Sequence, residues 1–159
     1  MPTRTQAART RTSSVPIRHP EVEILARVPL FSGLSRSQLR SVAQLAEEVS
    51  YTAGRMIVRA GSPGVAFYVI VEGEAKVLRG TIASARGTWR LGPGDFFGEL
   101  ALLDGRPRSA SVVAETPLRT IRIERAPFRR LLKEQPAIAL ALLEGMATRL
   151  RGTLEGVTV

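Results

Sequence analysis

The segment 49–124 constrains the fold most, because it is broken into short apolar runs separated by glycine-containing turns. The runs are rich in Val, Ile, Tyr, Phe and Thr, the residues that favour strands. Seven of them occur, at 49–53, 55–59, 65–71, 74–80, 85–91, 109–115 and 118–124. Strands of this length and spacing are typical of an antiparallel barrel or sandwich. We therefore expect a mainly β fold.

Helical patterns flank this segment on both sides. A short helix is expected from Glu21 to Arg27, and Ser35 with Gln38 forms a capping box for a second helix that reaches about Glu47. After the last run, Pro127 suits the first turn of a helix, and Pro136 ends that helix and starts another. We expect a domain over 21–159, with its β region at about 49–124 and closing helices at about 126–157.

The last helix carries two apolar faces. One is a heptad-like seam, and the opposite face holds Ile138, Leu142 and Arg149. The seam consists of Leu140, Leu143, Ala147, Leu150, Leu154 and Val157. A second copy of this helix would bury the seam in a homodimer. In the alternative, the domain itself buries the whole helix.

The charge is unevenly distributed along the 159 residues. Lys and Arg exceed Asp and Glu by 9, and Arg4, Arg9, Arg11 and Arg18 lie before the first acidic residue. Residues 1–20 lack an apolar period and are expected to form a disordered basic tail. A solvated arm is the simplest interpretation, with nucleic-acid contact or a transit peptide as alternatives.

Composition argues against most enzyme chemistry. There is no cysteine, and the one histidine, His19, lies in the tail, so we expect neither a metal site nor a catalytic residue. The longest apolar runs are far shorter than the ~18 residues that span a bilayer. We expect a cytoplasmic protein that is not an enzyme and has no membrane partner.

One stretch, 97–112, carries more specific chemistry. Gly98 allows close approach of the backbone to a ligand, and the amide groups of the following turn can hold an anion. The planar guanidinium of Arg108 can pair with the same anion, and Glu99 can accept hydrogen bonds from a ribose hydroxyl. A phosphate diester fits this set. In the alternative, Glu99 and Arg108 form an ordinary surface ion pair.

The same stretch resembles the phosphate-binding cassette of the cyclic nucleotide-binding domain family, of the catabolite activator and protein kinase A regulatory subunit type. That cassette reads Phe-Gly-Glu-Leu/Ile-Ala-Leu, four variable residues, then Pro-Arg-x-Ala-x-Val, and each fixed element stands between Phe97 and Val112. The resemblance extends to VPLFSGLSRSQL, AGSPGVAFYVIVEGEAKV and FRRLLKEQPAIALALLEGMATRLR, and covers about 21–151. It implies a β-roll, a jelly-roll-like barrel with N-terminal and C-terminal helices.

The resemblance also implies a ligand, cAMP or less favourably cGMP, and no other cofactor. In it, Arg108 neutralises the cyclic phosphate, Glu99 accepts the ribose 2′-hydroxyl, and a side chain of the closing helix caps the base. The implied ligand-binding residues are Phe97, Gly98, Glu99, Leu100, Ala101, Arg108, Ser109 and Ala110. The candidates for the cap are Met146, Thr148 and Arg149. Trp89 is expected to be a packed aromatic residue rather than a base-stacking platform, and Arg106 a solvated loop residue.

The function expected from the sequence is a cyclic-nucleotide sensor whose C-terminal helix moves or dimerises on binding. No helix-turn-helix follows the closing helix before Val159, so we expect a stand-alone domain that acts through an unknown output protein or through self-association, and not through DNA. Two alternatives remain. One is a DNA-associated transcriptional regulator, or a fragment of one, that uses the tail or a partner; the other is a degenerate interaction module that binds no nucleotide.

Overall fold

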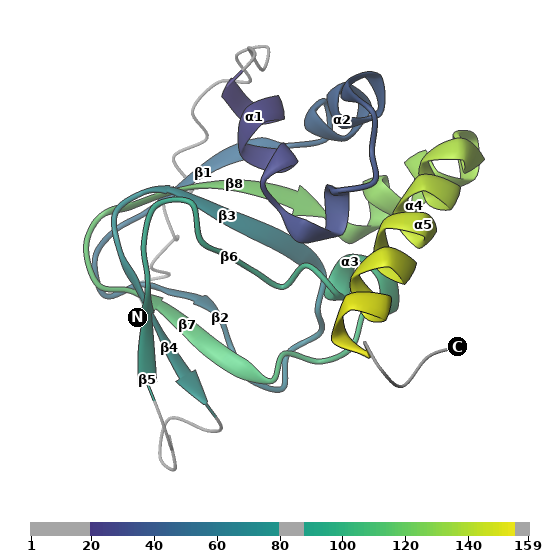
Figure 1. Cartoon of the computed structure of the whole chain (residues 1–159). Coiled ribbons are helices and arrows are strands. Elements are labelled where there is room, and N and C mark those ends of the chain that lie inside the picture. The colour runs from purple at the N-terminus through teal and green to yellow at the C-terminus, as the bar shows by residue number, and fades with distance from the viewer. Residues whose placement is uncertain (1–19, 80–87, 155–159) are drawn as a thin grey trace.

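Two four-stranded antiparallel sheets, with the orders β1-β8-β3-β6 and β2-β7-β4-β5, form the body of the protein (Figure 1). This computed structural model describes residues 20–79 and 88–154. Within these residues the strands are β1 Glu47–Tyr51, β2 Met56–Val58, β3 Ala66–Glu72, β4 Ala75–Arg79, β5 Thr88–Leu91, β6 Phe96–Phe97, β7 Ala110–Ala114 and β8 Leu118–Glu124. The expectation of a mainly β-roll fold with flanking helices is confirmed.

Each of the seven predicted runs overlaps one strand, and β6 is the strand that the sequence did not reveal. It has two residues, too few to show an alternating pattern. It pairs with the middle of β3, where Tyr68 lies opposite Phe97 and the two rings stack at 4.9 Å. This pairing leads the chain directly from the sheet into Gly98.

The helices lie at the ends of the chain, except for one turn between β6 and β7. They are α1 Pro20–Ala26, η1 Pro29–Phe31, α2 Arg36–Ala43, α3 Ala101–Asp104, α4 Arg125–Glu134 and α5 Pro136–Thr153. The capping box is confirmed, since the Ser35 hydroxyl accepts from the Gln38 amide and the Gln38 side chain accepts from the Ser35 amide. The expected extension of that helix to Glu47 is wrong, because Glu47 already belongs to β1, where it pairs with Arg122 of β8.

The core has two parts. The larger lies between the helices and the β1-β8-β3-β6 sheet, with Phe31 at its centre, 5.9 Å from the ring of Phe67 and 6.2 Å from that of Phe128. The smaller includes Ile70 and Val77 and lies inside the roll. Side chains of β3 are buried on both faces of the strand because one face meets the helices and the other meets the roll interior.

Helix α5 packs on the domain through one face only. Ile138 and Leu142 are buried, and Gly145 lies so close to Gly33 that a Cβ added to Gly145 would stand 3.0 Å from the Gly33 nitrogen. The opposite face leaves Leu140 and Leu143 each 61% exposed and Leu150 58% exposed; Ala147 is exposed as well, and Leu154 is half-buried. The structure therefore contradicts the alternative in which the domain buries the whole helix.

Two predictions fall outside the described part of the chain. The basic tail, 1–20, lies almost entirely before the first described residue, and Val157 of the seam lies beyond the last one. The domain limits drawn from the sequence stay predictions. Among the described helices, none has the length and apolar character needed to traverse a lipid bilayer.

Candidate functional site

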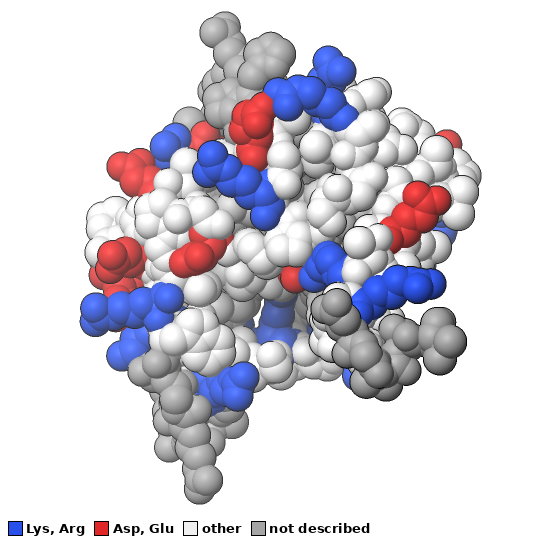
Figure 2. Space-filling view, in the orientation of Figure 1, with Lys and Arg blue, Asp and Glu red and all other residues white. Residues whose placement is uncertain are grey.

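A cavity of about 460 Å³ lies between the segment 96–110 and the inner face of the second sheet. Figure 2 shows a hollow on this side of the molecule, with basic side chains inside it and at its edge. Its volume falls in the range of small-molecule sites. The cavity is bordered by all eight predicted ligand-binding residues, Phe97, Gly98, Glu99, Leu100, Ala101, Arg108, Ser109 and Ala110.

Gly98 occupies a position that no other residue can adopt without strain. Its φ is +79°, in the left-handed region that glycine enters freely. A Cβ at this position would also meet the guanidinium of Arg108 and lie 3.0 Å from the carbonyl oxygen of Ala66. The glycine therefore lets the turn and the arginine approach each other at the cavity wall.

Arg108 is held from two sides. Its backbone amide donates to the Ser62 carbonyl at 2.8 Å, and the Gly61 amide donates to the Arg108 carbonyl at 2.8 Å. Its Nη2 donates to the carbonyl of Ala66. Burial lowers the pKa of Arg108, an effect that Tyr68 opposes. Within residues 20–79 and 88–154 no carboxylate forms an ion pair with this half-buried guanidinium.

Glu99 faces the helices rather than Arg108. Burial raises its pKa, while the charge of Arg149 and a hydrogen bond from the Leu30 amide oppose that rise. Its Oε2 is buried and finds no hydrogen-bond partner among the described residues. The alternative of an ordinary Glu99–Arg108 ion pair is therefore wrong. Glu99 therefore interacts with elements from both ends of the chain, with η1 through the Leu30 amide and with α5 through the charge of Arg149.

The short turn after Gly98 places the remaining predicted donors. The Ala101 amide donates to the Gly98 carbonyl at 3.2 Å, which closes the turn that opens α3. Leu100 and Ser109 are exposed at the cavity rim. Arg106, also exposed, uses its backbone amide to donate to Asp104 at 3.0 Å, as suits a loop residue.

The three cap candidates on α5 lie outside the cavity lining. Met146 packs against the helical core, and the Thr148 hydroxyl donates to the Glu144 carbonyl at 3.0 Å. Arg149 is exposed and influences the site through its charge on Glu99. Their role in capping the base stays a prediction.

Two residues of the β4–β5 pair border the cavity without having been predicted to do so. Arg79 and Trp89 both line it, and Trp89 is 43% exposed, so the expectation of a packed aromatic residue is wrong. Trp89 pairs with the buried Val77, which puts both side chains on one face of the sheet. The sequence carried no signal for this, because the register of two strands is set by their pairing.

The loop before β3 supports the cassette. A Cβ added to Gly64 would lie 2.5 Å from the Arg106 carbonyl and 2.6 Å from the Ala101 side chain, so only glycine allows this approach. The sequence had indicated nothing beyond a turn here. The described residues contain no cluster of three or more His, Cys, Asp or Glu side chains suited to a metal ion.

Comparisons with known proteins agree with this geometry. The family model of the cyclic nucleotide-binding domain matches residues 48–135. A cAMP-dependent protein kinase regulatory subunit of Aspergillus fumigatus is 43% identical over 108 residues, which are 68% of this chain and 26% of that protein. The chain thus spans about a quarter of the length of such relatives.

Two solved structures extend the likeness. The N-terminal domain of a transcriptional regulator from Streptomyces coelicolor A3(2) superposes with a TM-score of 0.74 at 31% identity, over 86% of this chain and 98% of that one. The regulatory domain of Toxoplasma gondii PKA, crystallised with cAMP, gives a TM-score of 0.61 at 29% identity, over 81% and 49%. The chain therefore belongs to the cyclic nucleotide-binding domain family.

Proposed function

We propose that this chain is a sensor of a cyclic nucleotide, with cAMP as the first candidate and cGMP as the second. One observation carries the proposal: the half-buried Arg108 borders a ligand-sized cavity and has no carboxylate partner among the described residues. A cation that is buried without a paired anion costs free energy, and a bound anion offsets that cost. The cyclic phosphate supplies that anion, with one negative charge and two free oxygens for the planar guanidinium.

The rest of the nucleotide matches the neighbouring groups. Glu99 accepts the ribose 2′-hydroxyl through the oxygen that lacks a partner, and Gly98, Leu100, Ala101 and Ser109 line the phosphate. Adenine is favoured because the A. fumigatus relative is named as cAMP-dependent and the T. gondii domain was crystallised with cAMP. We place the protein among non-catalytic regulators, and its cytoplasmic location stays a prediction.

Glu99 gives the site a route to the helices. A ribose hydroxyl that donates to this carboxylate joins the Leu30 amide as a second donor and changes the attraction of the carboxylate to Arg149. The site is thereby linked to η1 and α5, and ligand binding shifts α5 if the nucleotide binds one of its positions more tightly. The output passes to a partner protein or to a second copy.

Calorimetric titration of cAMP and cGMP into the full chain tests the proposal. Arg108→Ala should weaken binding by about 2 to 5 kcal/mol, the cost of leaving a buried phosphate without its partner. Arg55→Ala, a change at an exposed arginine outside the cavity lining, is the control and should leave the affinity unchanged. If wild type gives no heat with either nucleotide, the protein is a degenerate module; equal affinity in Arg108→Ala removes this residue from the site.

We further propose that the chain forms a homodimer through the exposed leucines of α5. Leu140, Leu143 and Leu150 present a continuous apolar row, with Ala147 between them and Leu154 at its end. Leu150→Glu should convert a dimer to a monomer in sedimentation experiments. Arg130→Glu, at an exposed position of α4, is the control that should not. A wild-type monomer with and without nucleotide excludes the dimer.

A further inference from the structure

The β4–β5 pair carries an aromatic side chain that the core does not use. Trp89 is the only tryptophan in the sequence, and 43% of it is exposed at the edge of the cavity. In the antiparallel register it lies opposite Val77, which is 4% exposed and part of the roll interior. Directly paired residues share a face of the sheet, so Trp89 continues the interior face toward the open end.

Arg79 fixes the position of this tryptophan. Ala75, Val77 and Arg79 alternate along β4 and therefore share the interior face with Trp89. The guanidinium carbon of Arg79 lies 5.4 Å from the centre of the indole ring, which is a cation–π contact. The contact restrains the indole while leaving much of its surface open to the cavity.

The two ends of the cavity therefore differ in polarity. Its cassette end holds Arg108, Glu99 and Ser109, whereas its β4–β5 end holds Val77, Trp89 and Leu91. A cyclic nucleotide is divided in the same way, with phosphate and ribose at one end and a flat heterocycle at the other. The α5 residues expected to cap the base do not border the cavity, so Trp89 is the exposed aromatic surface that meets a base bound there.

We propose that Trp89, held by Arg79, is the platform on which the base of the bound nucleotide stacks, and that it gives purine cyclic nucleotides an advantage over pyrimidine ones. This inference rests on the proposed function. Stacking on an aromatic side chain tolerates any base but grows with the size of the π-face, so the two-ring purines gain more than cytosine. Arg79 adds positive charge beside the electron-rich ring.

Titrations of cAMP and cCMP into the full-length protein test the platform. Trp89→Ala should weaken cAMP binding by about 5- to 150-fold and bring the affinities for cAMP and cCMP closer together. Trp89→Phe should retain most of the affinity, because a smaller aromatic ring still stacks. Arg79→Gln should weaken cAMP binding by about two- to fivefold, as the loss of an exposed cation–π contact predicts.

The neighbouring Arg90 supplies the matched control, since it lies on the opposite face of β5 and pairs with Glu115 at 3.1 Å. Arg90→Ala should bind cAMP as wild type does. Circular dichroism spectra that match wild type establish that each variant is folded. Equal cAMP affinity in wild type and in a folded Trp89→Ala overturns the platform but not the proposed function, whereas a wild type that binds neither nucleotide overturns both.

The single tryptophan gives a second readout that needs no substitution. Binding of cAMP should quench the Trp89 emission and lower its quenching by acrylamide, because the base covers the exposed face of the indole. Saturation with cAMP, established by calorimetry, that leaves both the emission and the acrylamide quenching unchanged contradicts stacking on Trp89.

Discussion

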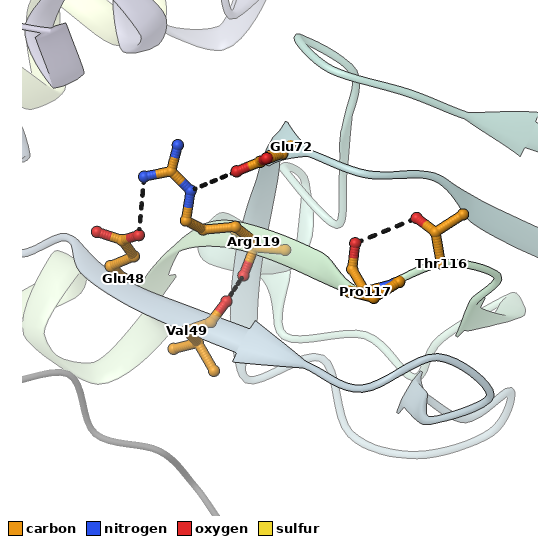
Figure 3. A network of polar contacts seen from close by, with 7 residues as sticks. Glu48, Val49, Glu72, Thr116, Pro117 and Arg119 are labelled. Atoms are coloured by element: carbon orange, nitrogen blue, oxygen red, sulfur yellow. Dashed lines mark hydrogen bonds and ion pairs between the residues drawn. The ribbon is translucent and has the colours of Figure 1, made fainter.

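Two arginines of this protein, Arg119 and Arg108, lie in opposite electrostatic settings. Arg119 stands on the outer face of the β1-β8-β3-β6 sheet, where its Nη1 lies 3.1 Å from Glu48 and its Nε 3.3 Å from Glu72 (Figure 3). The next residue, Thr120, is buried and donates to the Val49 carbonyl at 2.8 Å. Arg108 has only the Ala66 carbonyl as its side-chain hydrogen-bond partner among the described residues.

The difference separates a charge that serves the fold from one that is available to a ligand. The network around Arg119 links three strands, and its acceptors are supplied by the chain itself. The guanidinium of Arg108 is more buried, and burial lowers its pKa. Leaving such a cation without an anion lowers stability, and proteins tolerate this cost where function requires it.

The largest expected effect is that Arg108→Ala removes the stabilisation by ligand, whereas Arg119→Ala lowers only the basal stability. At a hundredfold excess over Kd, cAMP should stabilise wild type by about 2.7 kcal/mol, a rise in Tm of about 5–10 °C. Arg108→Ala should abolish this rise without lowering the Tm of the free protein, since it removes an unpaired buried charge. Arg119→Ala should keep the rise and lower the basal Tm by at most about 4 °C. Thermal melts with and without cAMP measure the basal Tm and its rise on binding. If Arg108→Ala retains the rise, Arg108 is no more available to the ligand than Arg119 is.

The second prediction concerns the close backbone contact between α5 and the turn after η1, which involves no ligand. A Cβ at Gly33 would meet the Ala141 carbonyl and lie 3.1 Å from the Gly145 Cα, so the backbone of α5 must move. Gly33→Ala should destabilise the protein by about 1–3 kcal/mol in urea unfolding.

Gly152 provides the control for this substitution, because nothing lies within 4 Å of a Cβ added there. Gly152→Ala should not destabilise α5. Equal stability of the Gly33 variant and wild type would mean that α5 does not depend on this close contact.

The third prediction concerns Glu99, which lines the same cavity as Arg108. Burial raises its pKa, so its ionisation opposes folding and its contribution to stability is lost as pH rises from its unfolded pKa through its folded one. Glu99→Gln should flatten that dependence and weaken cAMP binding by about 5- to 10-fold, because a neutral amide accepts the ribose hydroxyl less strongly. Glu134→Gln, at an exposed site, is the control. Unchanged affinity in Glu99→Gln would assign the carboxylate to the helices alone.

The smallest effect is expected at Glu21, which lies beside the Arg119 network. Burial and the charge of Glu48 raise the pKa of Glu21 to about 7. Protonation is therefore favoured in the folded state, and stability falls as pH rises from about 4.5 to 7. Glu21→Gln should raise the Tm at pH 8 by at most about 2 °C, because the carboxylate is only partly buried and solvent screens its charge. A Tm that is unchanged at pH 8 and a pH profile that matches wild type would contradict a destabilising charge at Glu21.

Most of the fold could be predicted because its signals are local. The alternation in 118–124 and the Ser35–Gln38 capping box each involve neighbouring residues, and both appear in the structure. Prediction failed where distant contacts decide: α2 ends at Ala43 because the following residues join a sheet with β8, some 70 residues away. The cassette was found in full because it is one continuous stretch.

The sequence by itself determined the order of strands and helices, apart from β6, and the chemistry carried by 97–112, since alternation, capping and the glycine position are properties of adjacent residues. Tertiary structure decided what those residues face. It placed Arg108 against Ala66 rather than Glu99, opened Trp89 to the cavity and left one face of α5 uncovered. The physical reason is that solvent exposure and charge pairing depend on which distant segments pack together, and no short stretch of sequence records this.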